Sequence, residues 1–242
     1  MSILNQIEDE PNRWKSLFKI GGMAAILAAI LLLIEIVIFA VWPQQTTAIN
    51  LFTLFLANKF LGLLDFYLLE IIVYILFIPI FLALYISIKR INESFMLIAL
   101  LLAITGISVF LSTNNPFSLL NLSDQYWAAT TEVQKSVLLA AGQALIANTG
   151  QRAVGGFNMG FFLISISGFI ISATMYKGDI FSKKTAYIGL LAFGISLFDY
   201  IRIIFIPTAT LLLLIIAVTS GIFLIVWFVL VGRRLITLEI FD

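Results

Sequence analysis

The chain contains no cysteine and no histidine, and charged residues make up only 11% of its 242 residues. Without cysteine it cannot form a disulfide, a thiolate zinc site or a cysteine-ligated iron–sulfur cluster. Without histidine it cannot form a histidine-ligated haem, a histidine-containing metal triad, or a Ser-His-Asp or Cys-His catalytic pair. Carboxylates, lysine, tyrosine, serine, threonine and amides remain for chemistry. We therefore expect no enzymatic activity, no cofactor and no metal ion.

The scarcity of charge comes with an excess of apolar residues. Hydrophobic residues make up 62% of the chain, and its mean hydropathy is +1.11. A soluble domain is typically about 45–50% apolar and about 25% charged. The composition excludes an ordinary soluble protein and predicts an integral membrane protein whose surroundings are the lipid bilayer. The net charge of +1 gives no basic excess that would indicate nucleic-acid binding.

Six apolar runs are long enough to cross a hydrocarbon core of roughly 30 Å, which takes about 20 helical residues. They cover residues 20–41, 66–88, 95–112, 157–175, 187–206 and 208–231. The first run is too long for the apolar part of a secretory signal and is expected to stay as an anchor. Only Pro207 separates the last two runs, so a tight turn is expected there. We expect one all-α transmembrane domain over residues 1–242, built as a bundle of six helices.

Two shorter segments are expected to be helical without spanning. Residues 51–64 are apolar but contain Lys59, which suits a short interfacial or re-entrant helix, and Asp65 is predicted to cap the second span. The loop between the third and fourth spans, residues 113–156, is long. Within it, residues 123–148 are expected to form one or two helices that begin at Ser123-Asp124.

The basic residues predict the orientation. With six spans, both termini share a side with the loops after spans two and four. That side carries ten of the 14 Lys and Arg residues, and the other side carries Lys59, Lys135, Arg152 and Arg202. Cytoplasmic loops hold the excess of Lys and Arg. We therefore expect both termini in the cytoplasm and the loop 113–156 outside.

Small residues spaced by four indicate close helix packing. The first span carries Gly21, Ala25 and Ala29, and the fourth begins with Gly156 and Gly160, with Gly168 on the same line. Such residues let helices approach closely in lipid. Packing within the bundle is the first explanation, and a face for a second copy or a partner membrane protein is the other.

The ionisable residues within the spans are the candidate site. A charge at the membrane centre costs about 2.5–3.5 kcal/mol, so such residues usually face the protein interior or water. The predicted topology places Glu35, Glu70, Asp199 and Arg202 in the outer halves of spans one, two and five, with Asn158 at the outer start of span four. The inner halves carry only mild candidates: Thr105, Ser108, Ser165, Ser167 and Ser196.

Two interpretations of these residues stand side by side. Asp199 and Arg202 share a helix face at i,i+3 and are expected to form an ion pair. Glu35 and Glu70 then lack a basic partner within the spans, unless Lys59 folds back to them. In one interpretation they line an outward-facing polar cavity that binds a cation or a small polar molecule. In the other, Arg202 is held by Asp199 and one glutamate in a network that only sets helix register, and Glu70 touches lipid headgroups.

Several stretches resemble a family of uncharacterised prokaryotic six-span integral membrane proteins, catalogued as a domain of unknown function. They are residues 115–126 (NPFSLLNLSDQY), 128–131 (AATT), 138–145 (LLAAGQAL), 170–172 (IIS), 181–189 (FSKKTAYIG) and 232–235 (GRRL). The resemblance covers the chain from the first span to the C-terminus. It implies the cytoplasmic membrane of a bacterium or archaeon and about six spans, but no activity and no functional residues.

These observations leave three classes of function. A binding, sensing or transport protein would use the outer polar cluster, and an outward-facing pocket fits better than a through-pore because the inner halves lack polar groups. A non-catalytic accessory or scaffold subunit of a membrane complex explains the small-residue faces. An intramembrane enzyme acting on lipid would need Glu35 and Asp199 as acid and base, and no metal-binding acidic motif supports it.

Overall fold

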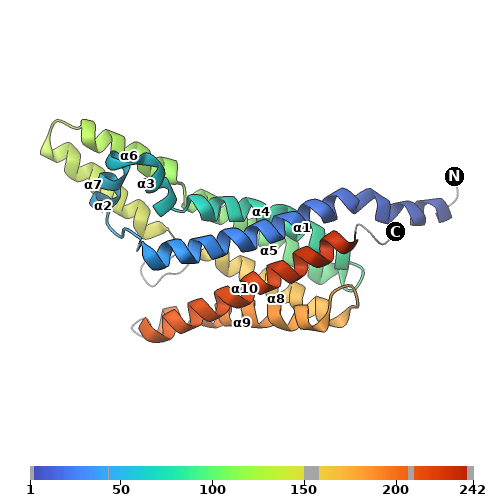
Figure 1. The fold of residues 1–242 in the computed structure, drawn as a ribbon. Coiled ribbons are helices and arrows are strands. Elements are labelled where there is room, and N and C mark those ends of the chain that lie inside the picture. The colour runs from blue at the N-terminus through green and yellow to red at the C-terminus, as the bar shows by residue number, and fades with distance from the viewer. Residues whose placement is uncertain (1–2, 43, 150–157, 207–209, 239–242) are drawn as a thin grey trace.

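The computed structural model describes residues 3–42, 44–149, 158–206 and 210–238, and within them all regular structure is helical (Figure 1). The helices are α1 (Ile3–Val41), α2 (Ala48–Ala57), α3 (Lys59–Asp65), α4 (Leu68–Ile88), α5 (Glu93–Thr113), α6 (Pro116–Ala128), α7 (Glu132–Asn148), α8 (Met159–Lys177), α9 (Lys183–Phe205) and α10 (Thr210–Leu238). Six of them contain stretches long and apolar enough to span a membrane, which confirms the predicted six-span all-α class. The turn expected at Pro207 lies outside the described residues.

The helices are longer than the apolar runs that predicted them. α1 begins at Ile3 rather than near residue 20, α9 includes Lys183 and Lys184, and α10 continues through Arg233 and Arg234. The length of an apolar run reflects the thickness of the hydrocarbon core. The helical hydrogen bonding of the backbone continues beyond it into the polar region until a proline or a capping residue ends the helix. Hydropathy therefore located the spans but not the helix ends.

The six long helices form a closed ring in which each packs against the next along the chain. The order is α1, α4, α5, α8, α9 and α10, and α10 closes the ring by packing along α1. The serine hydroxyl of Ser167 on α8 donates a 2.6 Å hydrogen bond to the carbonyl oxygen of Ala99 on α5. The ring places α4 opposite α9, so residues on these two helices face each other across its interior.

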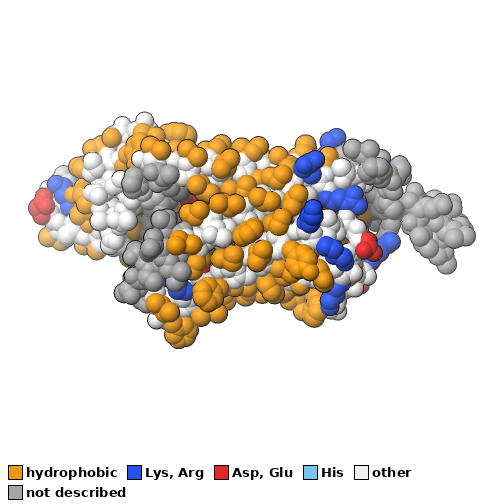
Figure 2. Space-filling model, turned by 60° about the horizontal axis from the view of Figure 1, so that its bottom comes forward, with side chains coloured by type: hydrophobic (Ala, Val, Ile, Leu, Met, Phe, Trp, Pro, Cys, Tyr) orange, Lys and Arg blue, Asp and Glu red, His pale blue; other side chains and the backbone are white. Residues whose placement is uncertain are grey.

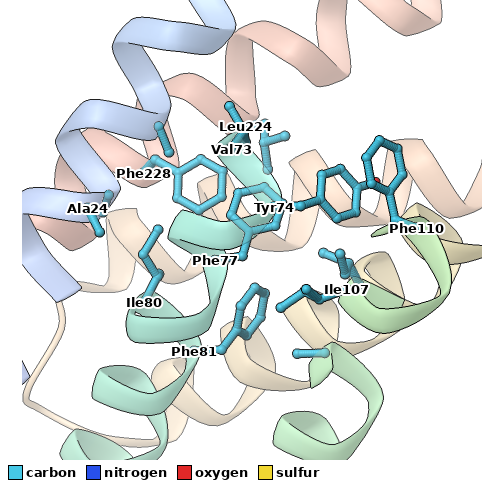
Figure 3. Packing of buried hydrophobic residues seen from close by; sticks show 14 of the residues in the cluster. Ala24, Val73, Tyr74, Phe77, Ile80, Phe81, Ile107, Phe110, Leu224 and Phe228 are labelled. Atoms are coloured by element: carbon cyan, nitrogen blue, oxygen red, sulfur yellow. The ribbon is translucent and has the colours of Figure 1, made fainter. Parts of the chain in front are cut away.

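Aromatic side chains fill the interior of this ring. Phe77 of α4 stacks on Phe228 of α10 with ring centroids 5.2 Å apart, and both are labelled in Figure 3. Phe193 of α9 meets Trp227 of α10 edge to face at 5.0 Å. All four side chains are buried. The interior is therefore a packed core and not an open channel along the described helices.

Glycines mark the points where helix backbones approach most closely. A Cβ atom at Gly160 of α8 would lie 2.7 Å from the carbonyl oxygen of Gly106 on α5, and one at Gly21 of α1 would lie 2.8 Å from that of Pro79 on α4. Gly168 faces the ring of Phe193, and Ala25 and Ala29 are buried. The described small residues spaced by four therefore pack against other helices of this chain, as predicted from packing within the bundle. Gly156 lies outside the described residues.

The four shorter helices form a separate layer at one end of the ring, which we call the cap (α2, α3, α6 and α7). α2 packs on α3, α6 and α7, and α3 packs on α6 and on the start of α4. Figure 1 shows the cap at the end away from the start of α1 and the end of α10. We call the two ends of the ring the cap end and the terminal end. The expected helical loop between the third and fourth spans is confirmed.

The predicted helix boundaries in the cap were wrong in two places. The single helix expected over residues 51–64 is split at Asn58, whose side chain accepts a hydrogen bond from the amide of Leu61 and so starts α3. The helix expected to begin at Ser123-Asp124 begins instead at Pro116, where Asn115 accepts from the amide of Phe117. Ser123 lies inside α6. In both places an asparagine starts the helix, since its side-chain oxygen reaches a free amide, and at the second place it does so in place of the predicted Ser123.

Asp65 does not cap the second span. It is the last residue of α3, and both oxygens of its carboxylate accept from the backbone amide of Gln45 at 3.3 Å. α4 begins after Tyr67, which has φ 66° and makes no side-chain cap hydrogen bond. A non-glycine residue in this left-handed region is strained and is held there by its surroundings. Tyr67 is buried, so packing between the cap and the ring supplies that restraint.

Basic side chains gather at the terminal end. Figure 2 shows Lys and Arg atoms in a group at one end of the apolar surface, on the side where the chain termini lie. The turn between α4 and α5 carries Lys89 and Arg90, and α10 carries Arg233 and Arg234 near its end. The sequence positions and the fold therefore agree on which loops share a side.

The glycine contacts generate a stability prediction. Replacing Gly160 by alanine forces the backbones of α5 and α8 apart, because the nearest atoms to the new Cβ are backbone atoms and the Cβ of Phe110. We expect a loss of about 1–3 kcal/mol, seen as a lower thermal unfolding midpoint of the detergent-solubilised protein.

Gly221→Ala is the matched control. Its new Cβ would lie 3.8 Å from the nearest atom, so the better helix propensity of alanine, worth up to about 1 kcal/mol, should leave the midpoint unchanged or raise it. Equal midpoints for the two variants would contradict the close approach of α5 and α8.

Candidate functional site

Two buried carboxyl groups from different helices meet near the cap end. Glu35 lies in the last two turns of α1 and is 9% exposed, and Glu70 lies in the first turn of α4 and is 8% exposed. The two side chains lie within hydrogen-bonding reach of each other. They meet because α1 packs along α4, which brings the end of one helix beside the start of the other.

Tyr74 is a third polar residue at this place, one helical turn after Glu70. Its ring stacks on Phe110 of α5 with centroids 3.5 Å apart and planes 12° from parallel, and Figure 3 shows the two rings side by side. Its hydroxyl interacts electrostatically with Glu35, with Glu70 and with Tyr200 of α9. Tyr74 is not among the site residues predicted from the sequence, although its spacing of four from Glu70 puts both residues on one face of α4.

One polar atom at this place, Oε2 of Glu35, is buried and makes no hydrogen bond within the described part of the chain. A buried polar group without a partner costs about 1–3 kcal/mol. The group of Glu35, Glu70 and Tyr74, which we call the carboxyl site, therefore contains a buried carboxylate oxygen, Oε2 of Glu35, to which no described residue donates a hydrogen bond.

Asp199 and Arg202 form the expected ion pair on α9. The Nε atom of Arg202 donates to Oδ1 of Asp199 at 2.6 Å, and its Nη1 atom donates to the carbonyl oxygen of Ile206 at 3.2 Å. Arg202 is 3% exposed, and its Nη2 atom is buried without a hydrogen-bond partner among the described residues. The negative charge of Asp199 balances the positive charge of Arg202, so the pair as a whole is neutral.

Tyr200 links α9 to the carboxyl site. It lies between Asp199 and Arg202 in the chain, and its aromatic ring packs edge to face on that of Phe162, with centroids 5.3 Å apart. Its hydroxyl interacts electrostatically with that of Tyr74 across the helix bundle. The sequence placed the polar groups of spans one, two and five at one depth. The structure brings Glu35 and Glu70 together and leaves the ion pair on α9, on the other side of the ring.

Two further residues named from the sequence serve other purposes. The side chain of Asn158 accepts from the amide of Phe161 at 3.0 Å and is the N-cap of α8. Lys59 forms a 2.9 Å ion pair with Asp124 on the cap, so it does not fold back to the glutamates. That possibility was wrong because α3 packs against α6, where Asp124 is the nearer carboxylate.

Four of the five mild polar candidates of the spans form hydrogen bonds within the bundle. Ser108, Ser165 and Ser196 donate to carbonyl oxygens four residues earlier in their own helices, and Ser167 donates to α5. Among the described residues, no group of three or more Asp and Glu side chains could hold a metal ion. Buried polar atoms without a hydrogen-bond partner among the described residues also occur at Ser172 of α8 and Trp227 of α10, which both lie against Gly189, so they are not confined to the carboxyl site.

Comparison with family models, with curated proteins and with solved structures finds no match to this chain. The class that the fold defines is a multi-pass helical membrane protein with six spans. The family resemblance of residues 115–145 and 181–189 stays a prediction.

The ion pair generates a testable prediction. Asp199→Asn would leave the buried guanidinium of Arg202 without its counter-charge, and we expect a loss of about 3 kcal/mol in unfolding free energy. The double variant Asp199→Leu, Arg202→Met removes both charges and should recover much of that loss, because a paired charge and its partner can be replaced together by apolar residues. Thermal unfolding in detergent measures both. A double variant that is no more stable than Asp199→Asn would show that the two charges do not compensate each other.

Proposed function

We propose that this chain is a multi-pass membrane protein that binds a cation or a small polar ligand at the carboxyl site, between α1, α4 and α9. The observation that carries the proposal is the meeting of Glu35 and Glu70 inside the bundle, within hydrogen-bonding reach. Each buried charge in a membrane costs about 2.5–3.5 kcal/mol, and such residues typically mark ligand or ion sites. The buried Oε2 atom of Glu35, which makes no hydrogen bond with the described residues, supports the same conclusion.

The ligand would enter from the cap end and leave by the same route. The carboxyl site lies at the end of α1 and the start of α4, next to the cap. Toward the terminal end, aromatic rings such as Phe77, Phe193 and Trp227 fill the interior. A binding or sensing role therefore has more support than transport through the bundle.

The orientation we propose places the cap outside the cell and both termini in the cytoplasm of a bacterium or archaeon. Ten of the 14 Lys and Arg residues belong to the terminal end, and a Lys and Arg excess is typical of cytoplasmic loops. The family resemblance supports a prokaryotic cytoplasmic membrane.

A non-catalytic accessory or scaffold subunit is the second candidate. The observation that favours it is the dense packing of the ring. The space beside Gly160 and Gly168 is filled by Phe110 and Phe193 of the same chain. In that function Glu35 and Glu70 would only hold α1 in register on α4. A membrane partner or a second copy would then bind the apolar outer surface.

The discriminating experiment is a ligand screen on the detergent-solubilised full chain. Sodium, potassium, calcium, small amines and amino acids are added separately, and the thermal unfolding midpoint is recorded. A ligand present at 100 times its Kd stabilises a protein by about 2.7 kcal/mol, which for a chain of this size raises the midpoint by about 5–10 °C. We expect at least one of these probes to stabilise the wild type and to lose that effect in Glu35→Gln.

Glu93→Gln is the matched control, because Glu93 is an exposed glutamate at the start of α5 on the terminal end. It should respond to every probe as the wild type does. If no probe stabilises the wild type, and Glu35→Gln is simply less stable than Glu93→Gln, the register-holding role is the correct one.

The orientation has its own test, which the lack of cysteine makes simple. A single cysteine is introduced at Glu132 in the cap or at Lys184 near the start of α9, both exposed. In intact cells a membrane-impermeant maleimide should label Glu132→Cys and should label Lys184→Cys only after lysis. The reverse pattern would place the cap in the cytoplasm.

A further inference from the structure

Two segments that are far apart in the chain lie against each other at the terminal end. They are the connection between α8 and α9 with the residues beside it, 177–184, and the turn between α4 and α5, 89–92. Ile91 packs directly on Gly178, and near the end of α10 the Nε atom of Arg234 donates a 2.5 Å hydrogen bond to a carbonyl oxygen of the same connection. These contacts gather the two segments in one place, which we call the basic edge.

The basic edge carries much more positive than negative charge. Its two segments contain five basic residues and one acidic residue, Asp179. Lys177 and Lys184 are exposed, and neither forms an ion pair within the described part of the chain. No described side chain balances their charge, so a partner that binds at this edge should itself be negatively charged.

Two exposed tyrosines lie beside these lysines. Tyr176 is in the last turn of α8 and Tyr187 is near the start of α9, and the Tyr187 hydroxyl donates a 3.2 Å hydrogen bond to that of Tyr176. Their rings meet edge to face with centroids 5.2 Å apart, and Nζ of Lys183 lies 5.0 Å from the centroid of the Tyr176 ring. Exposed tyrosines with basic neighbours are typical of the level of the lipid headgroups, because the ring is apolar and its hydroxyl is polar.

The surface of α8 and α9 becomes apolar beyond the tyrosines. Phe169 lies two turns before Tyr176 and Leu191 lies one turn after Tyr187, and both are exposed. Phe169 also lies over Gly194 of α9, where a Cβ atom would be 3.5 Å from its ring. Figure 2 shows the basic side chains at the edge of such an apolar surface. A soluble anion would match only the basic part, whereas a lipid with an anionic headgroup matches both parts.

We propose that the basic edge binds an anionic phospholipid, with the lipid phosphate beside Lys177 and Lys184 and the acyl chains along Phe169 and Leu191. The turn 89–92 adds positive charge from a second pair of helices, so the headgroup attracts both segments of the edge. Lysine near an anionic membrane surface binds it by electrostatic attraction that salt weakens. This inference goes beyond the proposed function, and it depends neither on the carboxyl site nor on the orientation of the chain.

The test is a lipid titration of the detergent-solubilised full chain, followed by its thermal unfolding midpoint. The probes are phosphatidylglycerol, phosphatidylcholine with the same acyl chains, and inorganic phosphate. We expect phosphatidylglycerol to raise the midpoint by about 5–10 °C at 100 times its Kd, and the other two probes to have little effect. Raising the salt from 0.1 M to 1 M should weaken the effect, because the Debye length falls from about 10 Å to about 3 Å.

The double variant Lys177→Gln, Lys184→Gln tests where the lipid binds. Both side chains are exposed, so the fold should be kept without lipid. We expect the apparent Kd for phosphatidylglycerol to rise about 25-fold, because each lysine near an anionic surface contributes about fivefold to binding. The variant Lys177→Arg, Lys184→Arg retains the charge and should bind as the wild type does. Lys59→Gln is the matched control, since it removes an exposed lysine at the cap end and should leave the titration unchanged.

Four outcomes would overturn the inference. Equal stabilisation by phosphatidylglycerol and phosphatidylcholine would mean that only the acyl chains are recognised. Stabilisation by inorganic phosphate would indicate a site for a soluble anion. An unchanged titration in the double glutamine variant, or an equal loss in Lys59→Gln, would mean that the basic edge is not where the headgroup binds. If phosphatidylglycerol has no effect on the wild type, the edge binds no anionic lipid.

Discussion

Van der Waals contact between helices holds this bundle together, because in lipid an apolar side chain gains little by leaving the hydrocarbon for the protein interior. Helices must then touch closely, and they do so where a side chain is missing. Gly21 lets α1 rest on Pro79 and Ala83 of α4, and Gly160 lets α8 rest on Gly106 of α5. Between these contacts, aromatic rings such as Phe77 and Phe228 fill the interior. The ring of six helices follows from these contacts.

The carboxyl site depends on the same contacts. The seam between α1 and α4 begins near the terminal end at Gly21, continues through the buried Ala25 and Ala29, and reaches Glu35 beside Glu70 at the cap end. Because backbone contact at Gly21 fixes α1 against α4, α1 cannot slide along α4 and separate Glu35 from Glu70. The carboxyl groups are therefore held together by packing.

The cap places the start of α4. The backbone carbonyl of Phe52 in α2 accepts from both Ser123 and Trp127 of α6, which ties the two parts of the cap together. The chain then leaves α3 after Asp65 and turns through the left-handed Tyr67 into α4. Glu70 follows within one turn. The position of this glutamate thus depends on contacts made outside the spans.

The sequence by itself determined the class, the number of spans, the side shared by the basic loops and the Asp199–Arg202 pair. These follow from short-range physics: the apolar length needed to cross lipid, and the i,i+3 spacing on a helix. It misplaced the cap boundaries, because several residues could cap a helix and only packing chooses among them. Only the tertiary structure decided that Glu35 meets Glu70, that Tyr74 joins them and that Lys59 pairs with Asp124. Those contacts join residues far apart in the chain, and they depend on which helix faces pack together.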